Sequence, residues 1–229
     1  MNERCSSTNS STLPADEWVR ERTRFTALWI RAMPDGYAVA KAVFDQLREL
    51  YGEPHRHYHT LNHIRHCLHE FDGAAALMAD PDAIEMALWF HDAIYQAGDR
   101  DNERRSADLF RQWTDGRAAP AFQQRVDDLI MATTHREAPS RDDARFIVDI
   151  DLSSFGLPWE AFERDGRLIR AEFVGIADEQ YYSGHLRFLQ VLRNRPTFFN
   201  TEFFQQRYES VARENLTRII TDLHTRGYR

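Results

Sequence analysis

Cysteine, glycine and proline are all scarce in this chain of 229 residues. The two cysteines, Cys5 and Cys67, are too few for a disulfide framework, and this favours a reducing, cytoplasmic setting. Ten glycines and eight prolines are fewer than average usage gives a chain of this length. Such a composition favours long helices over a β architecture that is rich in turns.

Long apolar runs and a positive net charge are also missing. No segment approaches the roughly 18 apolar residues that span a bilayer, and residues 1–12 lack the apolar part of a signal peptide. The formal net charge of -7 argues against an extended nucleic-acid surface, although a local basic pocket for a phosphate is compatible with it. We therefore expect neither a membrane nor a long nucleic acid as a partner.

Apolar residues at spacings of three and four recur along most of the chain, as in amphipathic helices. No segment combines strand-like alternation with turn residues. The sequence predicts a disordered tail over residues 1–14 and one all-α domain, a compact bundle of about ten helices, over residues 15–229. The helices are expected at 17–33, 37–51, 60–78, 82–95, 103–113, 121–133, 143–152, 159–175, 178–193 and 200–224.

The histidines are unevenly distributed, because six of the ten lie between His55 and His69. His59, His63 and His66 are spaced by four and then three residues, which places them near one face of a helix or of its first turn. A partly solvated polar face explains any one of these histidines, and this is the interpretation we give to His55 and His69.

The pair His91-Asp92 directly follows the apolar segment 86–90. A carboxylate beside so apolar a helix is costly unless it is paired or binds a cation. The alternatives are that Asp92 pairs with an arginine or caps a helix, and that His91 is a hydrogen-bonded histidine of the core.

Two further segments place such groups in apolar surroundings. His135 follows the predicted helix at 121–133, and the apolar segment 146–152 contains both Asp149 and Asp151. Residues two apart on a helix do not share a face, so at most one of these aspartates reaches a common site. Imidazoles and carboxylates that converge in a helical core form a metal site. Such a site would consist of His59, His91, Asp92, His135 and one of the two aspartates.

The ligand types indicate which metals suit such a site. Mixed nitrogen and oxygen ligands fit a divalent ion such as Mn, Fe, Co, Ni, Zn or Mg. The site has no cysteine ligand, which argues against a structural zinc site.

The order His, His-Asp, Asp resembles the signature of the HD-domain superfamily of metal-dependent phosphohydrolases. The sequence around these residues is similar to that of a bacterial subgroup of predicted HD phosphohydrolases. The resemblance covers roughly residues 51–216. The segments that carry it are YHTLNHI at 58–64, WFHDAIY at 89–95, NERRSA at 102–107 and DIDL at 149–152.

The resemblance implies a helical fold in which four residues bind the metal. They are His59, His91, Asp92 and Asp151. We prefer His59 to His63 as the first metal ligand, because His63 falls where the family usually has an apolar residue. The resemblance also leaves roles for three residues as ligands of a second metal or as substrate contacts: His63, His135 and Asp149.

The implied reaction is hydrolysis of a small phosphate ester or nucleotide by a metal-activated water. Asp92 would orient the water, and Glu103 would transfer a proton, although Glu103 is equally explained as a favourable first-turn carboxylate. Further candidates for substrate binding are Arg56, Arg104, Tyr182 and Arg187.

Two other functions compete with hydrolysis. They are an HD-type di-iron oxygenase and a non-catalytic nucleotide-binding module. The sequence also leaves open whether the chain forms a homodimer.

Overall fold

The computed structural model describes residues 18–33, 36–139 and 141–229, and over these ranges the chain forms ten α-helices and no β-strand. The all-α prediction is thereby confirmed, whereas the tail expected at residues 1–14 lies outside the described residues. The helices are α1 (Val19–Ala32), α2 (Tyr37–Tyr51), α3 (Leu61–Ala74), α4 (Pro81–Phe90), α5 (Asn102–Thr114), α6 (Pro120–Ala132), α7 (Asp142–Asp151), α8 (Trp159–Glu172), α9 (Asp178–Arg193) and α10 (Glu202–Thr225).

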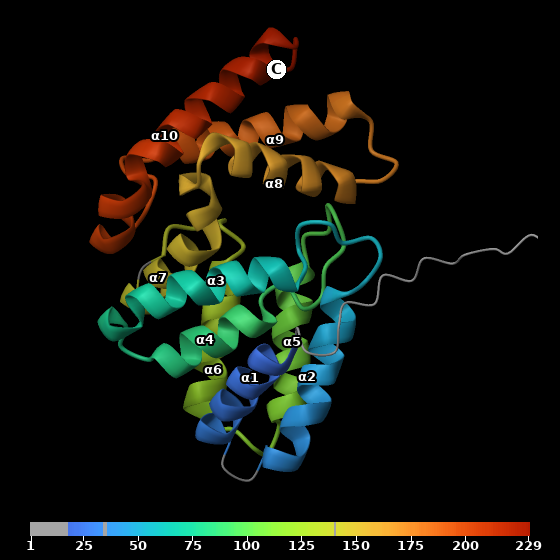
Figure 1. Ribbon diagram of the computed structural model, residues 1–229, viewed down its shortest axis with the longest axis vertical. Coiled ribbons are helices and arrows are strands. Elements are labelled where there is room, and N and C mark those ends of the chain that lie inside the picture. The colour runs from blue at the N-terminus through green and yellow to red at the C-terminus, as the bar shows by residue number, and fades with distance from the viewer. Residues whose placement is uncertain (1–17, 34–35, 140) are drawn as a thin grey trace, which may run out of the picture.

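The helices are arranged in two parts, which are stacked along the long axis of the molecule (Figure 1). Helices α1 to α7 form the larger part, and α8, α9 and α10 lie above it. The 3-10 turn η4 (Leu152–Gly156) joins α7 to the upper part, and both α8 and α10 pack against it. None of the described helices is both long and apolar enough to span a membrane.

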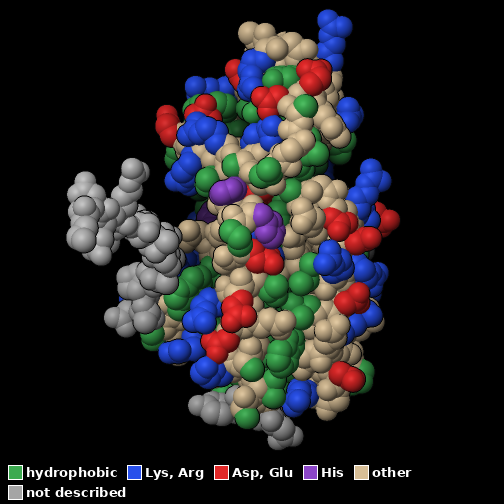
Figure 2. Space-filling view, turned by 90° about the vertical axis from the view of Figure 1, so that its right-hand side faces the viewer, with side chains coloured by type: hydrophobic (Ala, Val, Ile, Leu, Met, Phe, Trp, Pro, Cys, Tyr) green, Lys and Arg blue, Asp and Glu red, His purple; other side chains and the backbone are tan. Residues whose placement is uncertain are grey.

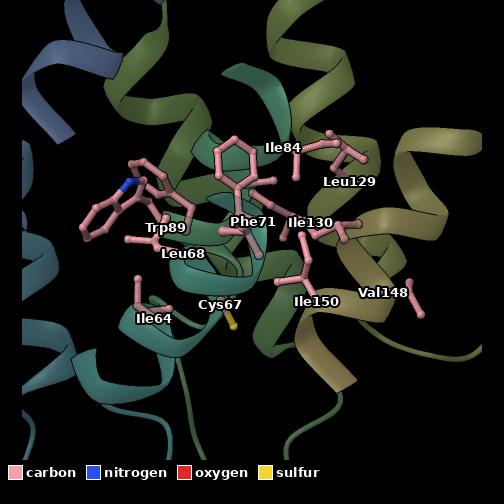
Figure 3. Close-up of a cluster of buried hydrophobic side chains, with 14 of the residues drawn as sticks. Ile64, Cys67, Leu68, Phe71, Ile84, Trp89, Leu129, Ile130, Val148 and Ile150 are labelled. Carbon is pink, nitrogen blue, oxygen red and sulfur yellow. The ribbon is translucent and has the colours of Figure 1, made fainter. Parts of the chain in front are cut away.

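Helix α4 lies at the centre of the larger part, as its apolar sequence predicts. Every residue from Ala83 to Phe90 is buried, and the helix packs against α1, α3, α5, α6 and α7. The side chain of Asp80 accepts a hydrogen bond from the backbone N–H of Ala83 and Pro81 is the first helical residue, so the start of α4 is capped. Figure 3 shows side chains of α3, α4, α6 and α7 meeting in this core.

Helix α4 ends at Phe90 and not near residue 95 as predicted. The guanidinium of Arg56 donates to the backbone carbonyls of Asp92 and Ala93, at 2.6 and 2.8 Å. These carbonyls would otherwise accept the N–H groups of the next helical turn. The helix therefore stops just before His91 and Asp92, and the His91 side chain stays buried.

Candidate metal centre

Three side chains from different parts of the fold converge on one buried point. Nε2 of His63 lies 3.3 Å from Nε2 of His91 and 3.2 Å from Oδ1 of Asp151, and Nε2 of His91 lies 3.5 Å from the same oxygen. His63 comes from α3, His91 from the end of α4 and Asp151 from the end of α7. This group of two imidazoles and one carboxylate could hold a metal ion.

The separations within this group match those of ligands around one ion. Ligands at about 2.0–2.1 Å from a tetrahedral ion lie about 3.3–3.4 Å from one another. Oδ2 of Asp92 lies at a similar distance from the two imidazoles, 3.5 Å from Nε2 of His63 and 3.1 Å from Nε2 of His91. Asp92 is therefore placed to supply a fourth ligand atom.

Local structure orients both imidazoles. Thr60 caps α3 by accepting from the N–H of Asn62, so His63 falls in the first helical turn and its side chain is almost completely buried. Nδ1 of His91 donates to the carbonyl of Leu88 at 3.0 Å. In the neutral ring this bond leaves the lone pair on Nε2, as a metal ligand requires.

The charges in the group also favour a cation. Burial alone would raise the pKa of Asp92 and of Asp151, but the surrounding imidazoles outweigh it and lower both. The pKa of His91 is raised, because Asp92 and Asp151 outweigh the burial of its ring. The His91 imidazole thus carries a proton that balances the carboxylates, and a divalent ion bound here would replace that proton.

His135 lies on the other oxygen of Asp151, with Nε2 at 2.9 Å from Oδ2. Its backbone has φ 54°, in the left-handed region that is unfavourable for a residue with a Cβ. Its buried Nδ1 has no hydrogen-bond partner among the described residues. The backbone of His135 thus accompanies a side chain that contacts Asp151, and the predicted role of His135 at a metal stays a prediction.

His59 lies beside this group and is not one of its three members. Nδ1 of His59 is 2.7 Å from Oε2 of Glu172, and the ring stacks on Tyr95 with the centroids 4.1 Å apart. The preference for His59 over His63 is therefore reversed by the geometry. The reason is that α3 begins at Leu61, so His63 is inside the helix and faces the core, whereas His59 precedes the cap.

Asp149 points away from the candidate metal centre, so the role considered for it at a second metal or a substrate is wrong. Its carboxylate accepts from the backbone N–H of Asn200 at 2.8 Å and of Thr201 at 2.7 Å, and from the Thr201 hydroxyl. It thereby holds the start of α10 against α7. The expectation that only one of the two aspartates reaches a common site is confirmed, and that residue is Asp151.

Glu103 lies on the first turn of α5 and is half-buried. Its pKa is raised, first by burial and then by the negative charges of Asp92 and Asp151. Its predicted role in proton transfer stays a prediction.

The four candidate substrate contacts are dispersed. The side chain of Arg56 is fully buried, and it donates to the carbonyls of His59, Asp92 and Ala93 and pairs with Glu53, so its predicted role in substrate binding is wrong. The other three do not join the metal group. Arg104 is exposed on α5, Arg187 is exposed on α9, and Tyr182 lines a cavity in the upper part of the fold.

Sequence reasoning missed Glu172, which holds the loop before α3. Oε1 accepts from the backbone N–H groups of His57, Tyr58 and His59 at 2.8, 2.8 and 2.9 Å, while Oε2 binds the His59 ring. A lone glutamate near the end of an amphipathic helix gives no signal of such a role, because its partners lie more than a hundred residues earlier.

Figure 2 shows histidine side chains beside an acidic side chain at the surface, where the upper part of the fold meets the lower one. Comparison with models of protein families, with curated proteins and with solved structures gives no match to this chain.

Proposed function

We propose that this chain is a metal-dependent phosphohydrolase of the HD type, which acts on a small phosphate ester or nucleotide. The observation that carries the proposal is the convergence of His63, His91 and Asp151 at ligand distances from three separate helices. The order of His, His-Asp and Asp along the chain supports the family assignment. Asp92, beside both imidazoles, completes the ligand set of the proposal.

A divalent ion bound here would supply Lewis acidity toward a phosphoryl oxygen and would lower the pKa of a coordinated water. Asp92 would orient that water, because its carboxylate lies 3.1 Å from Nε2 of His91 and remains partly exposed. Glu103, whose pKa is raised by burial and by the charges of Asp92 and Asp151, would hold or release a proton during the reaction.

The test is metal analysis of the purified protein together with a hydrolysis screen. We expect about one divalent ion per chain and hydrolysis of at least one of p-nitrophenyl phosphate or the nucleoside mono-, di- and triphosphates. Removal of the ion by a chelator should lower kcat/KM by about a thousandfold, and one of the candidate ions should restore it.

A protein that binds no divalent ion under these conditions would overturn the proposal. So would hydrolysis that is unchanged after verified removal of the ion.

A di-iron oxygenase is the second candidate, and the position of Asp151 favours it. Oδ1 of Asp151 faces His63 and His91, while Oδ2 faces His135, as in a carboxylate that bridges two metal ions. Anaerobic loading with iron distinguishes the two functions. A mixed-valent di-iron signal without phosphatase activity would select the oxygenase.

A further inference from the structure

A cavity of about 620 Å³ lies in the upper part of the fold, between α8, α9 and α10. Its volume is within the range of small-molecule sites. Five aromatic side chains from these helices and from η4 line it, and Ile169 and Ile219 add to the apolar lining. The aromatic residues are Phe155, Trp159, Phe162, Tyr181 and Tyr182.

The glycine at position 166 is unexplained by packing. Gly166 lies in the interior of α8, where glycine destabilises a helix relative to alanine. A Cβ added there would meet no atom within 4 Å, so no neighbour requires its absence. Gly166 lines the cavity, and a larger side chain would occupy its space. Because position 166 has no side chain, this part of the cavity stays open.

Among the described residues, the charged side chains on the wall include one cation without an ion pair. Glu163 pairs with Arg167 at 2.9 Å, Asp222 with Arg226 at 3.4 Å, and Asp165 with Arg164 at 2.9 Å. Arg218, by contrast, has no ion pair within the described part of the chain.

The guanidinium of Arg218 lies 3.9 Å from the ring centroid of Trp159, at the cavity wall. A guanidinium that is stacked on an aromatic ring favours an anionic partner.

The neutral polar groups on the wall suit an aromatic ligand. The rings of Tyr181 and His185 are stacked with an interplanar angle of 13°. Burial lowers the pKa of His185 to about 4, so this ring is uncharged near neutral pH and adds no second cation.

From these observations we infer that the cavity between α8, α9 and α10 is a binding site for a planar aromatic molecule with one negative charge. The site is separate from the candidate metal centre. Ser154 lines the cavity, and its hydroxyl accepts from the hydroxyl of Tyr58, whose ring lies between the cavity and His63. None of the three residues of the metal group lines the cavity, so we expect binding there without a metal.

The probe is 2-naphthoate, with binding measured by calorimetry and by ligand-observed NMR. Decahydro-2-naphthoate has the same charge without a planar ring, and 2-naphthamide has the ring without the charge. The wild-type chain should bind 2-naphthoate about tenfold more tightly than either control. The same affinity is expected after treatment with a chelator, which keeps this test independent of the proposed hydrolase function.

Two substitutions at one position test the location. Gly166→Phe should fill the cavity and weaken binding of 2-naphthoate by at least about tenfold. Gly166→Ala is the matched control, because it also removes the glycine from the helix but adds only one methyl group, and its affinity should stay within about threefold of wild type. Circular dichroism should show that both variants are folded.

Arg218→Gln tests the charge without altering the core, because Arg218 is exposed. This variant should bind 2-naphthoate and 2-naphthamide equally.

The inference is overturned if the wild-type chain does not bind 2-naphthoate, or binds the saturated analogue as tightly. It is also overturned if folded Gly166→Phe binds like wild type, or if Arg218→Gln keeps the preference for the anion.

Discussion

Replacing His91 by alanine is expected to weaken divalent-metal binding by at least about a hundredfold, since even a residue that only supports a metal ligand contributes tenfold to a hundredfold. His91 supplies one of the three converging ligand atoms, and its ring is fixed by the bond to Leu88. Hydrolytic activity should fall with metal content. Metal titration by calorimetry and metal analysis after dialysis measure the effect.

His69→Ala is the matched control for this experiment. His69 lies on α3, as His63 does, but its side chain is exposed. Its replacement should leave metal affinity and activity within about twofold of wild type, as for an ordinary surface substitution. Retention of full metal content by His91→Ala would contradict the assigned site.

The two aspartates of α7 provide a second, internal comparison. Asp151→Asn should lose metal, because Oδ1 of Asp151 is within 3.5 Å of both imidazoles. Asp149→Asn should keep the metal and lose stability, because its carboxylate holds the start of α10. Metal analysis and urea unfolding of both variants separate the two roles.

Much of the fold is predictable because apolar periodicity is a local property of the sequence. The bounds of α2 and α9 are those predicted, and the mostly apolar segment 83–90 lies in the core. The opposed faces of Asp149 and Asp151 also follow from helical geometry alone. Each of these inferences depends only on residues within one helix.

The candidate site is less predictable, because it depends on helix ends and on distant contacts. Whether His59 or His63 faces the core depends on where α3 begins, and Thr60 decides this by capping the helix. The end of α4 depends on the buried Arg56 of another segment. The spacing of apolar residues within one helix does not predict such hydrogen bonds between distant segments.

Replacing Glu172 by alanine is expected to lower the free energy of unfolding by about 3–5 kcal/mol, the range for breaking a buried ion pair by removing one partner. The side chain of Glu172 is fully buried and accepts from three consecutive backbone N–H groups and from His59. The substitution would leave those donors without an acceptor. Urea denaturation monitored by circular dichroism gives the difference.

The control is Glu163→Ala on the same helix. Glu163 also pairs with a cation, Arg167 at 2.9 Å, but both side chains are exposed. An exposed ion pair contributes about 0–1 kcal/mol, so this variant should be nearly as stable as wild type. Equal losses of stability in the two variants would show that Glu172 is not the residue that holds the loop before α3.

The contribution of Glu172 to the free energy of unfolding should also depend on pH, and it should decrease as the pH falls. Burial alone would raise its pKa, but the hydrogen bond and charge of His59 and the backbone N–H groups lower it to about 2. The unfolded chain, whose glutamates titrate near pH 4.5, therefore takes up a proton first as the pH falls. The stabilisation is complete above that value and is lost progressively below it. The stability difference between wild type and Glu172→Gln should accordingly shrink between about pH 5 and about pH 3, and a difference that grows over this interval would contradict the ionised state assigned to Glu172.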